Sequence, residues 1–581
     1  MGSKTVNIKI NNREYTVPAG YTVLEAARSV GIDIPTLCFL EHVNEIGACR
    51  MCVVEVKGAR SLVAACVYPV NEGLEVITNS RRVLESRRTT LELILSTHNK
   101  RCLSCDKSGN CELQNLCHQM GITNEEKYGG PINHFEEDHS SVHLVRDNSK
   151  CILCRRCVAA CKNQHVGVIG ANARGFDTSI GCAFEKPLDE VACVSCGQCI
   201  VACPTGALRE KDETEKTFAA LSDPTKHVVV FPAPSVRVTL GESFGMAPGT
   251  VVTGKMAAAC HRIGFDAVFD TNFSADLTIM EEATEFLGRV KSGGPLPLIT
   301  SCSPGWIRFV EQYYHEFLPN VSSCKSPQQM MGAMVKTYYA EKNGFDPKDI
   351  VTVSIMPCTA KKYEARREDQ AAAGVPDVDI ALTTRELAKM IMRTGINFEA
   401  LEDEPFDSVL GQSSGAADIF GTSGGVMEAA LRTAADILEG KDVDNVDYKE
   451  VRGTVGLKEA VYNVGGMEIK VAAVSGLSNV AKLLDDIKAG RKDYHFIEVM
   501  CCPGGCINGG GQPSQPAVVR NNVNLPAMRA AGLYREDAGK PLRKAHKNPS
   551  IIKVYEEYLG EPGSHKAHKI LHTTYKARSK Y

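Results

Sequence analysis

The sequence predicts a multidomain protein in which small α+β units precede one large α/β domain. Its 581 residues correspond to about four domains by length, and 43% of them are hydrophobic, which is enough for a large core. Most of its 24 cysteines lie in closely spaced groups within the first 210 residues. After a charged stretch at 209–216, buried parallel strands and glycine-rich turns predict the α/β part.

The charge balance and the N-terminal residues exclude several classes of protein. With 66 basic and 69 acidic residues the net charge is -3, so no basic surface indicates nucleic-acid binding. The first residues lack the apolar segment of a secretion signal, and no apolar run is long enough to span a bilayer. Clustered cysteines in a long chain favour metal-bound thiolates over disulfides. We therefore expect a cytoplasmic protein that binds neither nucleic acid nor a membrane.

Eight cysteines within the predicted domain at 140–212 repeat one spacing, C-x2-C-x2-C-x3-C, in two runs: Cys151, Cys154, Cys157 and Cys161, then Cys193, Cys196, Cys199 and Cys203. This spacing is typical of bacterial ferredoxins with two [4Fe–4S] clusters, in which the fourth cysteine of each run ligates the other cluster. Cys203 is therefore expected to join the first three cysteines, and Cys161 the second three. A zinc ribbon is the alternative for CxxC pairs. The doubled spacing and the following Pro204 favour an electron relay.

Residues 1–80 are predicted to form a β-grasp domain that holds a [2Fe–2S] cluster. Apolar and polar residues alternate over 6–10 and again over 15–17, which predicts a β-hairpin. The capping box at 22–25 predicts a helix that ends at Gly31. The spacing of the following cysteines differs from the plant type, and a zinc site is the alternative. The predicted ligands are Cys38, Cys49, Cys52 and Cys66.

One histidine and three cysteines within residues 81–125 form the next predicted set, which leaves Cys117 outside the pattern: His98, Cys102, Cys105 and Cys111. Taken alone, this set suits zinc as well as it suits iron–sulfur. Its position between two iron–sulfur domains favours a [4Fe–4S] cluster with one histidine and three cysteine ligands. An imidazole in place of a thiolate removes a negative charge, so we expect a raised reduction potential.

Residues 225–525 are predicted to form the α/β domain, with a ligand site where its strands end. Residues 228–231 and 351–355 are typical of buried parallel strands, and ligand sites in open α/β sheets lie at the carboxyl ends of such strands. Three loops with unusual residues stand out, at 300–306, 356–364 and 498–513. Their cysteines span about 200 residues yet can converge on one cluster, because the glycines of the third loop allow close backbone approach.

These three loops resemble the signature segments TSCCPxW, MPCxxKxxE and ExMxCxxGCxxGGGxP of the [FeFe]-hydrogenases. The similarity extends over essentially the whole chain, including a C-terminal tail at 526–581, whereas residues 1–210 alone resemble equally the large iron–sulfur subunit of NADH dehydrogenase complexes. The resemblance implies an [FeFe]-hydrogenase catalytic domain with an H-cluster. This group is a [4Fe–4S] cube joined through a cysteine sulfur to a two-iron subsite with CO, CN⁻ and azadithiolate ligands.

Position by position, the resemblance implies that Cys358, Cys502 and Cys506 ligate the cube and that Cys506 bridges to the two-iron subsite. It implies that Lys361 faces one cyanide, since a buried ammonium is tolerated beside an anionic ligand. Without the motif, Lys361 would be a surface lysine. Four further residues are implied at the two-iron subsite, the first two beside the other cyanide and the last two as soft apolar walls: Pro234, Ser235, Met356 and Met500.

One position departs from the family pattern. A ligand cysteine normally stands before Pro304, where this chain has Ser303, and the preceding Cys302 matches the family's proton-donating cysteine. Ser303 could ligate iron through oxygen, the cube could keep three thiolates, or the loop could shift so that Cys302 ligates. Cys501, next to Cys502, is another thiol within reach of the site. The residue mapping favours Cys302 as the proton relay.

The resemblance implies heterolytic cleavage of H2, in which a metal acts as Lewis acid and a positioned base takes the proton. The proton would leave through Cys302, Glu282, Ser322 and Glu285, with Arg289 at the surface end. Glu282 and Glu285 would share one face of a predicted helix, which without the motif would be an ordinary solvated face. Electrons would pass from the cube through three [4Fe–4S] clusters and one [2Fe–2S] cluster.

N-terminal clusters of this kind typically meet a flavoprotein. The chain therefore looks most like the hydrogenase subunit of NAD(P)-linked, electron-bifurcating complexes, with ferredoxin, a flavoprotein NAD(P)-binding subunit and a small [2Fe–2S] subunit as partners. No G-x-G-x-x-G fingerprint lies between a strand and a helix, so NAD or flavin would bind another chain. Two alternatives remain. An electron-transfer subunit would lack the three loops, and an H2-sensing relative with low turnover would lack the proton path.

Overall fold

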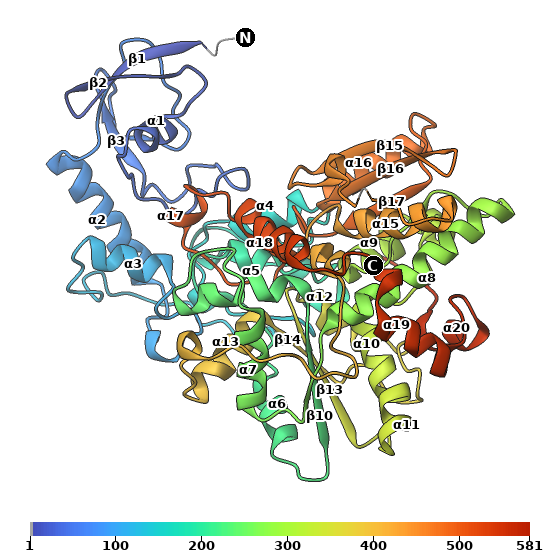
Figure 1. Cartoon of the computed structure of the whole chain (residues 1–581). Helices are drawn as coiled ribbons and strands as arrows, with labels where there is room; N and C mark the ends of the chain where they lie inside the picture. Colours follow the sequence, from blue (N-terminus) through green and yellow to red (C-terminus); the bar gives the residue numbers. More distant parts are fainter. Residues whose placement is uncertain (1–3, 445, 581) are drawn as a thin grey trace.

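The computed structural model describes residues 4–444 and 446–580 and confirms a multidomain architecture of α+β and α/β units (Figure 1). Figure 1 shows the N-terminal units, drawn in blue, on one side of the large domain. Hydrogen bonds from Asn44 to Cys154 O and from Gln198 to Asn508 O tie the segment at 140–212 to the units before and after it. This segment therefore connects the N-terminal units to the large domain.

The first 80 residues form one sheet and one helix, with elements β1 (Thr5–Ile10), β2 (Arg13–Pro18), α1 (Val23–Ser29), β3 (Val53–Val56), β4 (Val63–Ala64) and β5 (Glu75–Ile77). The strand order is β2-β1-β5-β3-β4. The predicted hairpin is confirmed by the antiparallel pairing of β1 with β2. The predicted helix is also confirmed. Thr22 and Glu25 form a capping box at its start, and Gly31, with a φ of +80°, follows its end.

Residues 81–212 contain short elements around the cysteine runs, namely α2 (Arg81–Ser96), α3 (Glu112–Gln119), β6 (Leu144–Arg146), α4 (Arg156–Asn163), β7 (Gly170–Asn172), β8 (Ser179–Gly181), α5 (Gln198–Ala202) and β9 (Leu208–Glu210). β6 pairs antiparallel with β9, and α4 packs against α5. Each cysteine run thus contributes one helix, and the two helices pack together as the halves of one unit.

The large domain contains two four-stranded sheets. Their strands are β10 (His227–Pro232), β11 (Ala267–Val268), β12 (Leu298–Ile299), β13 (Ile350–Met356), β14 (Ile380–Thr383), β15 (Leu457–Val464), β16 (Met467–Ser475) and β17 (Phe496–Met500). The first sheet, in the order β11-β10-β13-β14, is entirely parallel, which confirms the two strands predicted from the sequence. The second has the order β12-β17-β16-β15, and only β15 runs antiparallel.

Helices cover both sheets and continue into the C-terminal segment: α6 (Thr214–Leu221), α7 (Thr253–Ile263), α8 (Thr271–Ser292), α9 (Pro304–Tyr313), α10 (Pro327–Met334), α11 (Ala340–Asn343), α12 (Ala360–Glu364), α13 (Thr384–Arg393), α14 (Gly415–Asp418), α15 (Gly425–Glu439), α16 (Leu477–Lys488), α17 (Ala517–Arg520), α18 (Leu525–Gly539), α19 (Pro549–Val554) and α20 (His565–Leu571). Apolar residues of α8 pack on the first sheet with α7, α10 and α13, and on the second with α15. α9 and α16 cover the other face of the second sheet. α8 therefore lies between the two sheets.

Within the described residues, no helix is both long enough and apolar enough to cross a membrane.

Asp537 on α18 anchors the C-terminal segment through buried ion pairs. Its carboxylate lies 2.8 Å from Arg432 and 2.6 Å from Arg543, and Arg432 is fully buried. Asp537→Ala leaves a buried guanidinium short of a counter-charge, a change that typically costs about 3–5 kcal/mol. We expect the free energy of unfolding of the large domain to fall by that amount, measured in urea through the fluorescence of Trp306, the only tryptophan.

A matched control removes an exposed ion pair of the same domain. Asp493 lies 3.0 Å from Lys470, and its side chain is 82% exposed. Asp493→Ala should therefore lower the free energy of unfolding by less than about 1 kcal/mol. Similar small losses for Asp537→Ala and Asp493→Ala would contradict the anchoring role of Asp537.

Candidate active site and cluster sites

The four cysteines predicted in the first domain come together. The sulfur of Cys52 lies 3.3 Å from that of Cys66, and the backbone N–H groups of Cys38 and Cys49 each donate a hydrogen bond to the other's sulfur. Interaction with Cys52, burial and the nearby Cys38 and Cys49 raise the pKa of Cys66 well above its usual value. The predicted set is thus one group of four thiols.

The next predicted set contains three neighbouring thiols and a buried histidine. Cys111 interacts electrostatically with Cys105, and the neighbouring Cys117 interacts with both Cys111 and Cys102. Burial lowers the pKa of His98 to about 4, and its Nδ1 has no hydrogen-bond partner among the described residues. A buried polar atom without a partner is rare, so this imidazole is available as a ligand.

The two ferredoxin-type runs are interleaved as the spacing predicts. A cavity with an empty volume of about 380 Å³ is lined by three cysteines of the first run and one of the second: Cys151, Cys154, Cys157 and Cys203. Cys161 of the first run interacts electrostatically with Cys196, and Cys199 interacts with Cys196, Cys193 and Cys161. Each group therefore takes its fourth thiol from the other run.

A larger cavity, with an empty volume of about 700 Å³, lies where strands of both sheets end. Three thiols expected to ligate the cube line its wall, Cys358 directly after β13 and Cys502 and Cys506 after β17. Burial and the nearby Cys502 raise the pKa of Cys358 to about 12, and burial, Cys358 and Cys502 raise the pKa of Cys506 further. The three thiols are close enough to influence one another, as the ligands of a single cluster must be.

Glycines allow the two cysteine loops to approach each other. The Gly511 N–H group donates a 2.7 Å hydrogen bond to Pro357 O, and a Cβ atom at Gly509 would overlap the same carbonyl. Gly505 has a φ of +106°, which strains any other residue. The cavity and the three thiols together fit an iron–sulfur group, which prefers thiolate ligands.

Lys361 is buried at this cavity and is not a surface lysine. Its ammonium donates hydrogen bonds to Cys302 O at 3.1 Å, Ser326 Oγ at 2.8 Å and Glu364 Oε2 at 2.8 Å. Gln328 also lines the cavity and donates to the same Glu364 oxygen. The one carboxylate therefore holds Lys361 and Gln328 in place.

Other predicted residues surround the same cavity, namely Pro234, Ser235, Met356 and Met500, together with Cys302 and Ser303. Sequence reasoning missed several residues of the wall. Phe420 and Gly421 lie beside Ser235, and a Cβ atom at Gly421 would come within 3.0 Å of the Ser235 Cβ. The segment 420–425 belongs to the stretches that resemble the family, which was the available signal.

The residues of the predicted proton path are neighbours on α8 and around it, where Glu282 and Ser322 are buried and the other three are partly exposed. Burial, followed by the charge of Glu285, raises the pKa of Glu282 to about 8, while the neighbouring Ser322 opposes the shift. The Ser322 hydroxyl donates to Glu285 at 3.1 Å, and Glu285 forms a 2.6 Å ion pair with Arg289. Burial, and then the charge of Glu282, raise the pKa of Cys302 well above its usual value. Glu282 and Glu285 therefore do not lie on an ordinary solvent-exposed face of α8.

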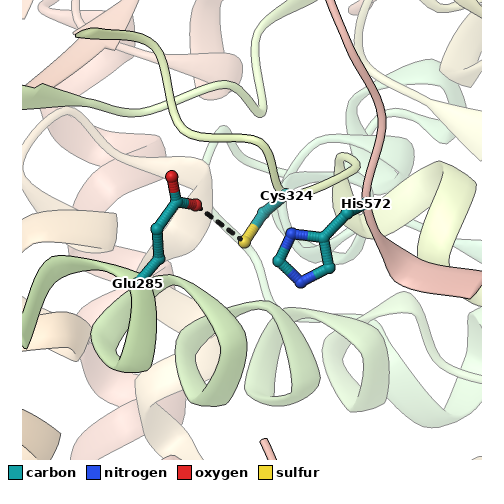
Figure 2. Close-up of side chains that lie close together, drawn as sticks. All are labelled: Glu285, Cys324 and His572. Atoms are coloured by element: carbon teal, nitrogen blue, oxygen red, sulfur yellow. Dashed lines mark hydrogen bonds between the residues drawn. The ribbon is translucent and has the colours of Figure 1, made fainter. Parts of the chain in front are cut away.

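The C-terminal segment adds a histidine that sequence reasoning missed. Figure 2 shows Glu285, Cys324 and His572 side by side, with Cys324 Sγ 3.7 Å from Glu285 Oε2. Ser323 Oγ lies 2.8 Å from His572 Nδ1 and donates to Glu285 at 3.1 Å. His572 Nε2 lies 2.9 Å from Glu281. No sequence pattern points to His572, because it follows Glu285 by almost the length of the domain.

The cysteine sites and the cysteine-lined cavity define an iron–sulfur oxidoreductase. Comparison with family models agrees with this class. Residues 226–510 match the iron only hydrogenase large subunit, C-terminal domain, and residues 525–578 match the iron hydrogenase small subunit. Earlier residues match a 2Fe-2S iron-sulfur cluster binding domain at 3–81, the NADH-ubiquinone oxidoreductase-G iron-sulfur binding region at 87–126 and a 4Fe-4S dicluster domain at 150–217.

Individual relatives agree over the full length. The chain is 49% identical to the NADP-reducing hydrogenase subunit HndD of Solidesulfovibrio fructosivorans, over 99% of each chain. It is 44% identical to iron hydrogenase 1 of Clostridium pasteurianum, over 98% of this chain and 99% of the relative. A solved structure of a variant of the apo [FeFe]-hydrogenase HydA1 of Chlamydomonas reinhardtii is 41% identical, covers 63% of this chain and 100% of its own, and has a TM-score of 0.57. The chain belongs to the iron-only, or [FeFe]-, hydrogenases.

The raised pKa of Glu282 predicts a pH-dependent stability. The ordinary value is 4.5, and the buried group titrates near pH 8, so between these values the unfolded chain ionises while the folded chain keeps the proton. This group therefore makes the free energy of unfolding higher below pH 4.5 than at pH 8. Between these values the free energy of unfolding falls by up to about 1.4 kcal/mol per pH unit. Glu282→Gln should remove this contribution, so the difference in unfolding free energy between variant and wild type should change steadily from pH 5 to pH 8, as the wild type alone loses stability. Parallel pH profiles of the two chains would contradict it.

Proposed function

We propose that the chain catalyses the reversible reaction H2 = 2 H⁺ + 2 e⁻ at an H-cluster. Convergence of Cys358, Cys502 and Cys506, together with the buried Lys361, on one cavity is the observation that carries this proposal. When bound, the H-cluster supplies a Lewis-acidic iron and a neighbouring base for heterolytic cleavage. In this proposal, the thiols hold the cube and Lys361 compensates an anionic ligand.

The side chains around Glu282 would carry the proton between the cavity and the surface. Cys302 keeps its proton at neutral pH because its pKa is raised. Glu282 can bind and release a proton near pH 8, where a relay group is most effective. Ser322 can then pass the proton to Glu285, and Arg289 lies beside Glu285.

Electrons would travel along contacts between the cluster sites. The Asn44 amide donates to the carbonyls of Cys38 and Cys154, which links the [2Fe–2S] site to the first ferredoxin-type site. A Cβ atom at Gly206 would lie 2.6 Å from Cys105 Sγ, so the His98 set lies against the segment that follows Cys203. We infer one [2Fe–2S] cluster, three [4Fe–4S] clusters and the H-cluster, in domains bounded at 1–80, 81–125, 140–212, 225–525 and 526–581.

The N-terminal domains support a role within a larger complex. The relative described as an NADP-reducing hydrogenase subunit aligns with this chain over 99% of each. We therefore propose ferredoxin, a flavoprotein NAD(P)-binding subunit and a small [2Fe–2S] subunit as partners, with electron bifurcation in the cytoplasm. An H2-sensing role is not favoured, because the row from Cys302 to Arg289 is complete.

The function is tested by H2 oxidation with an artificial electron acceptor, on anaerobic chain supplied with the two-iron subsite. Infrared bands of CO and CN⁻ together with turnover are expected. Glu282→Gln should retain the bands and lose about 10²–10⁴-fold in turnover, because it removes one proton-transfer group. The matched variant Glu281→Gln, one residue away and also buried, should lose much less. Bands without turnover in wild type would favour the sensing role, and absence of bands would contradict the H-cluster.

His98→Cys tests the proposed cluster of the second domain. A thiolate in place of the imidazole adds a negative charge beside the cluster, so its reduction potential should fall, by an amount on the order of 100 mV. The measurement is an electron paramagnetic resonance titration of both chains against potential. His118→Cys, a substitution outside the proposed ligand set in the same domain, should leave all potentials unchanged. An unaltered potential in His98→Cys would contradict ligation by His98.

A further inference from the structure

The three cysteines expected to hold the cube, Cys358, Cys502 and Cys506, leave a cubane cluster one thiolate short. Iron–sulfur cubes are normally held by four protein ligands, and the position before Pro304 carries Ser303. A serine hydroxyl remains protonated in the ordinary pH range and is a harder donor than a thiolate, so it is a poor replacement. The protein must therefore take the fourth ligand from elsewhere or leave one iron without a thiolate.

Besides these three cysteines and Cys302, one more cysteine lines the same cavity, Cys501. Cys501 is 3% exposed and follows the last residue of β17. Its backbone N–H group donates a 3.2 Å hydrogen bond to Ser303 Oγ, so the residue lies directly against the position that lacks a cysteine. Its thiol lies against those of Cys196 and Cys502.

The neighbouring helix leaves space for this thiol. Gly305 is the second residue of α9, and a Cβ atom there would lie 2.7 Å from Cys501 Sγ. Any other residue at 305 would displace the sulfur. Ser303, Gly305 and Cys501 thus form one arrangement. The sulfur atom comes from the end of β17, whereas the start of α9 provides none.

We propose that Cys501 provides the fourth thiolate of the cube. This assignment rests on the proposed H-cluster. It makes a shift of the 300–306 loop unnecessary and leaves Cys302 free at the start of the proton path. It also puts a cube ligand next to Cys196, which belongs to the nearer ferredoxin-type site.

The test compares chains produced without the two-iron subsite, so that the cube is examined without turnover. Iron and sulfide per chain are measured, and the reduced cube is followed by electron paramagnetic resonance, in wild type, Cys501→Ala, Ser303→Ala, Cys302→Ala and Cys501→Ala/Ser303→Cys. Cys260→Ala removes another fully buried thiol of the same domain and serves as the control. The signals of the N-terminal clusters and the fluorescence of Trp306 report folding.

Cys501→Ala should lose about four iron atoms per chain and the cube signal, and the added thiol of Cys501→Ala/Ser303→Cys should restore both. Ser303→Ala, Cys302→Ala and Cys260→Ala should retain them. The assignment is overturned if Cys501→Ala keeps the cube, if Ser303→Ala or Cys302→Ala loses it, or if the double variant fails to recover it. A wild-type chain without any cube in the catalytic domain would instead contradict the proposed function.

Discussion

Close contact between two glycine backbones is the constraint on which the proposed electron path depends. A Cβ atom at Gly510 would lie 2.7 Å from the Gly197 Cα, so the cysteine loop of the ferredoxin-like domain and the third loop of the catalytic domain meet without side chains between them. Two hydrogen bonds hold the same junction. Thr359 donates to Ser195 O at 2.8 Å, and Gln198 donates to Asn508 O at 3.0 Å. The thiols of Cys196 and Cys501 are neighbours because these backbones touch.

Burial of charge is the second feature that distinguishes the catalytic cavity. Burying an ammonium or a carboxylate group costs free energy unless the charge is paired or neutralised. The two groups at this cavity meet that condition in different ways. Lys361 is paired with Glu364, whereas burial keeps Glu282 protonated to about pH 8. These groups stabilise the fold poorly, but they hold a cation and a transferable proton next to a thiol-lined cavity. The C-terminal segment completes the surroundings, since His572 contacts both Ser323 and Glu281.

Much of the fold and of the cluster sites could be predicted, because their signals are local. The alternation over 6–10, the capping box at Thr22 and the CxxC spacings each involve residues a few positions apart, whose geometry the backbone dictates. The interleaving of the ferredoxin-type runs also follows from spacing. The environment of the carboxylates on α8, by contrast, could not be predicted from local patterns. Periodicity alone makes Glu282 and Glu285 a solvated face, whereas tertiary packing buries Glu282 and surrounds Glu285 with Ser322, Ser323 and Arg289.

The sequence by itself determined which residues are ligand candidates, since thiols, imidazole and glycines at fixed spacings are properties of the chain. It also showed that Ser303 interrupts the expected set and that Cys501 is a spare thiol. Only the tertiary structure decided that these two residues touch. They are 198 positions apart, and their contact follows from the way that β12 and β17 pair in parallel and end together at one cavity. Contacts at that separation depend on how sheets and helices pack, and no local pattern encodes them.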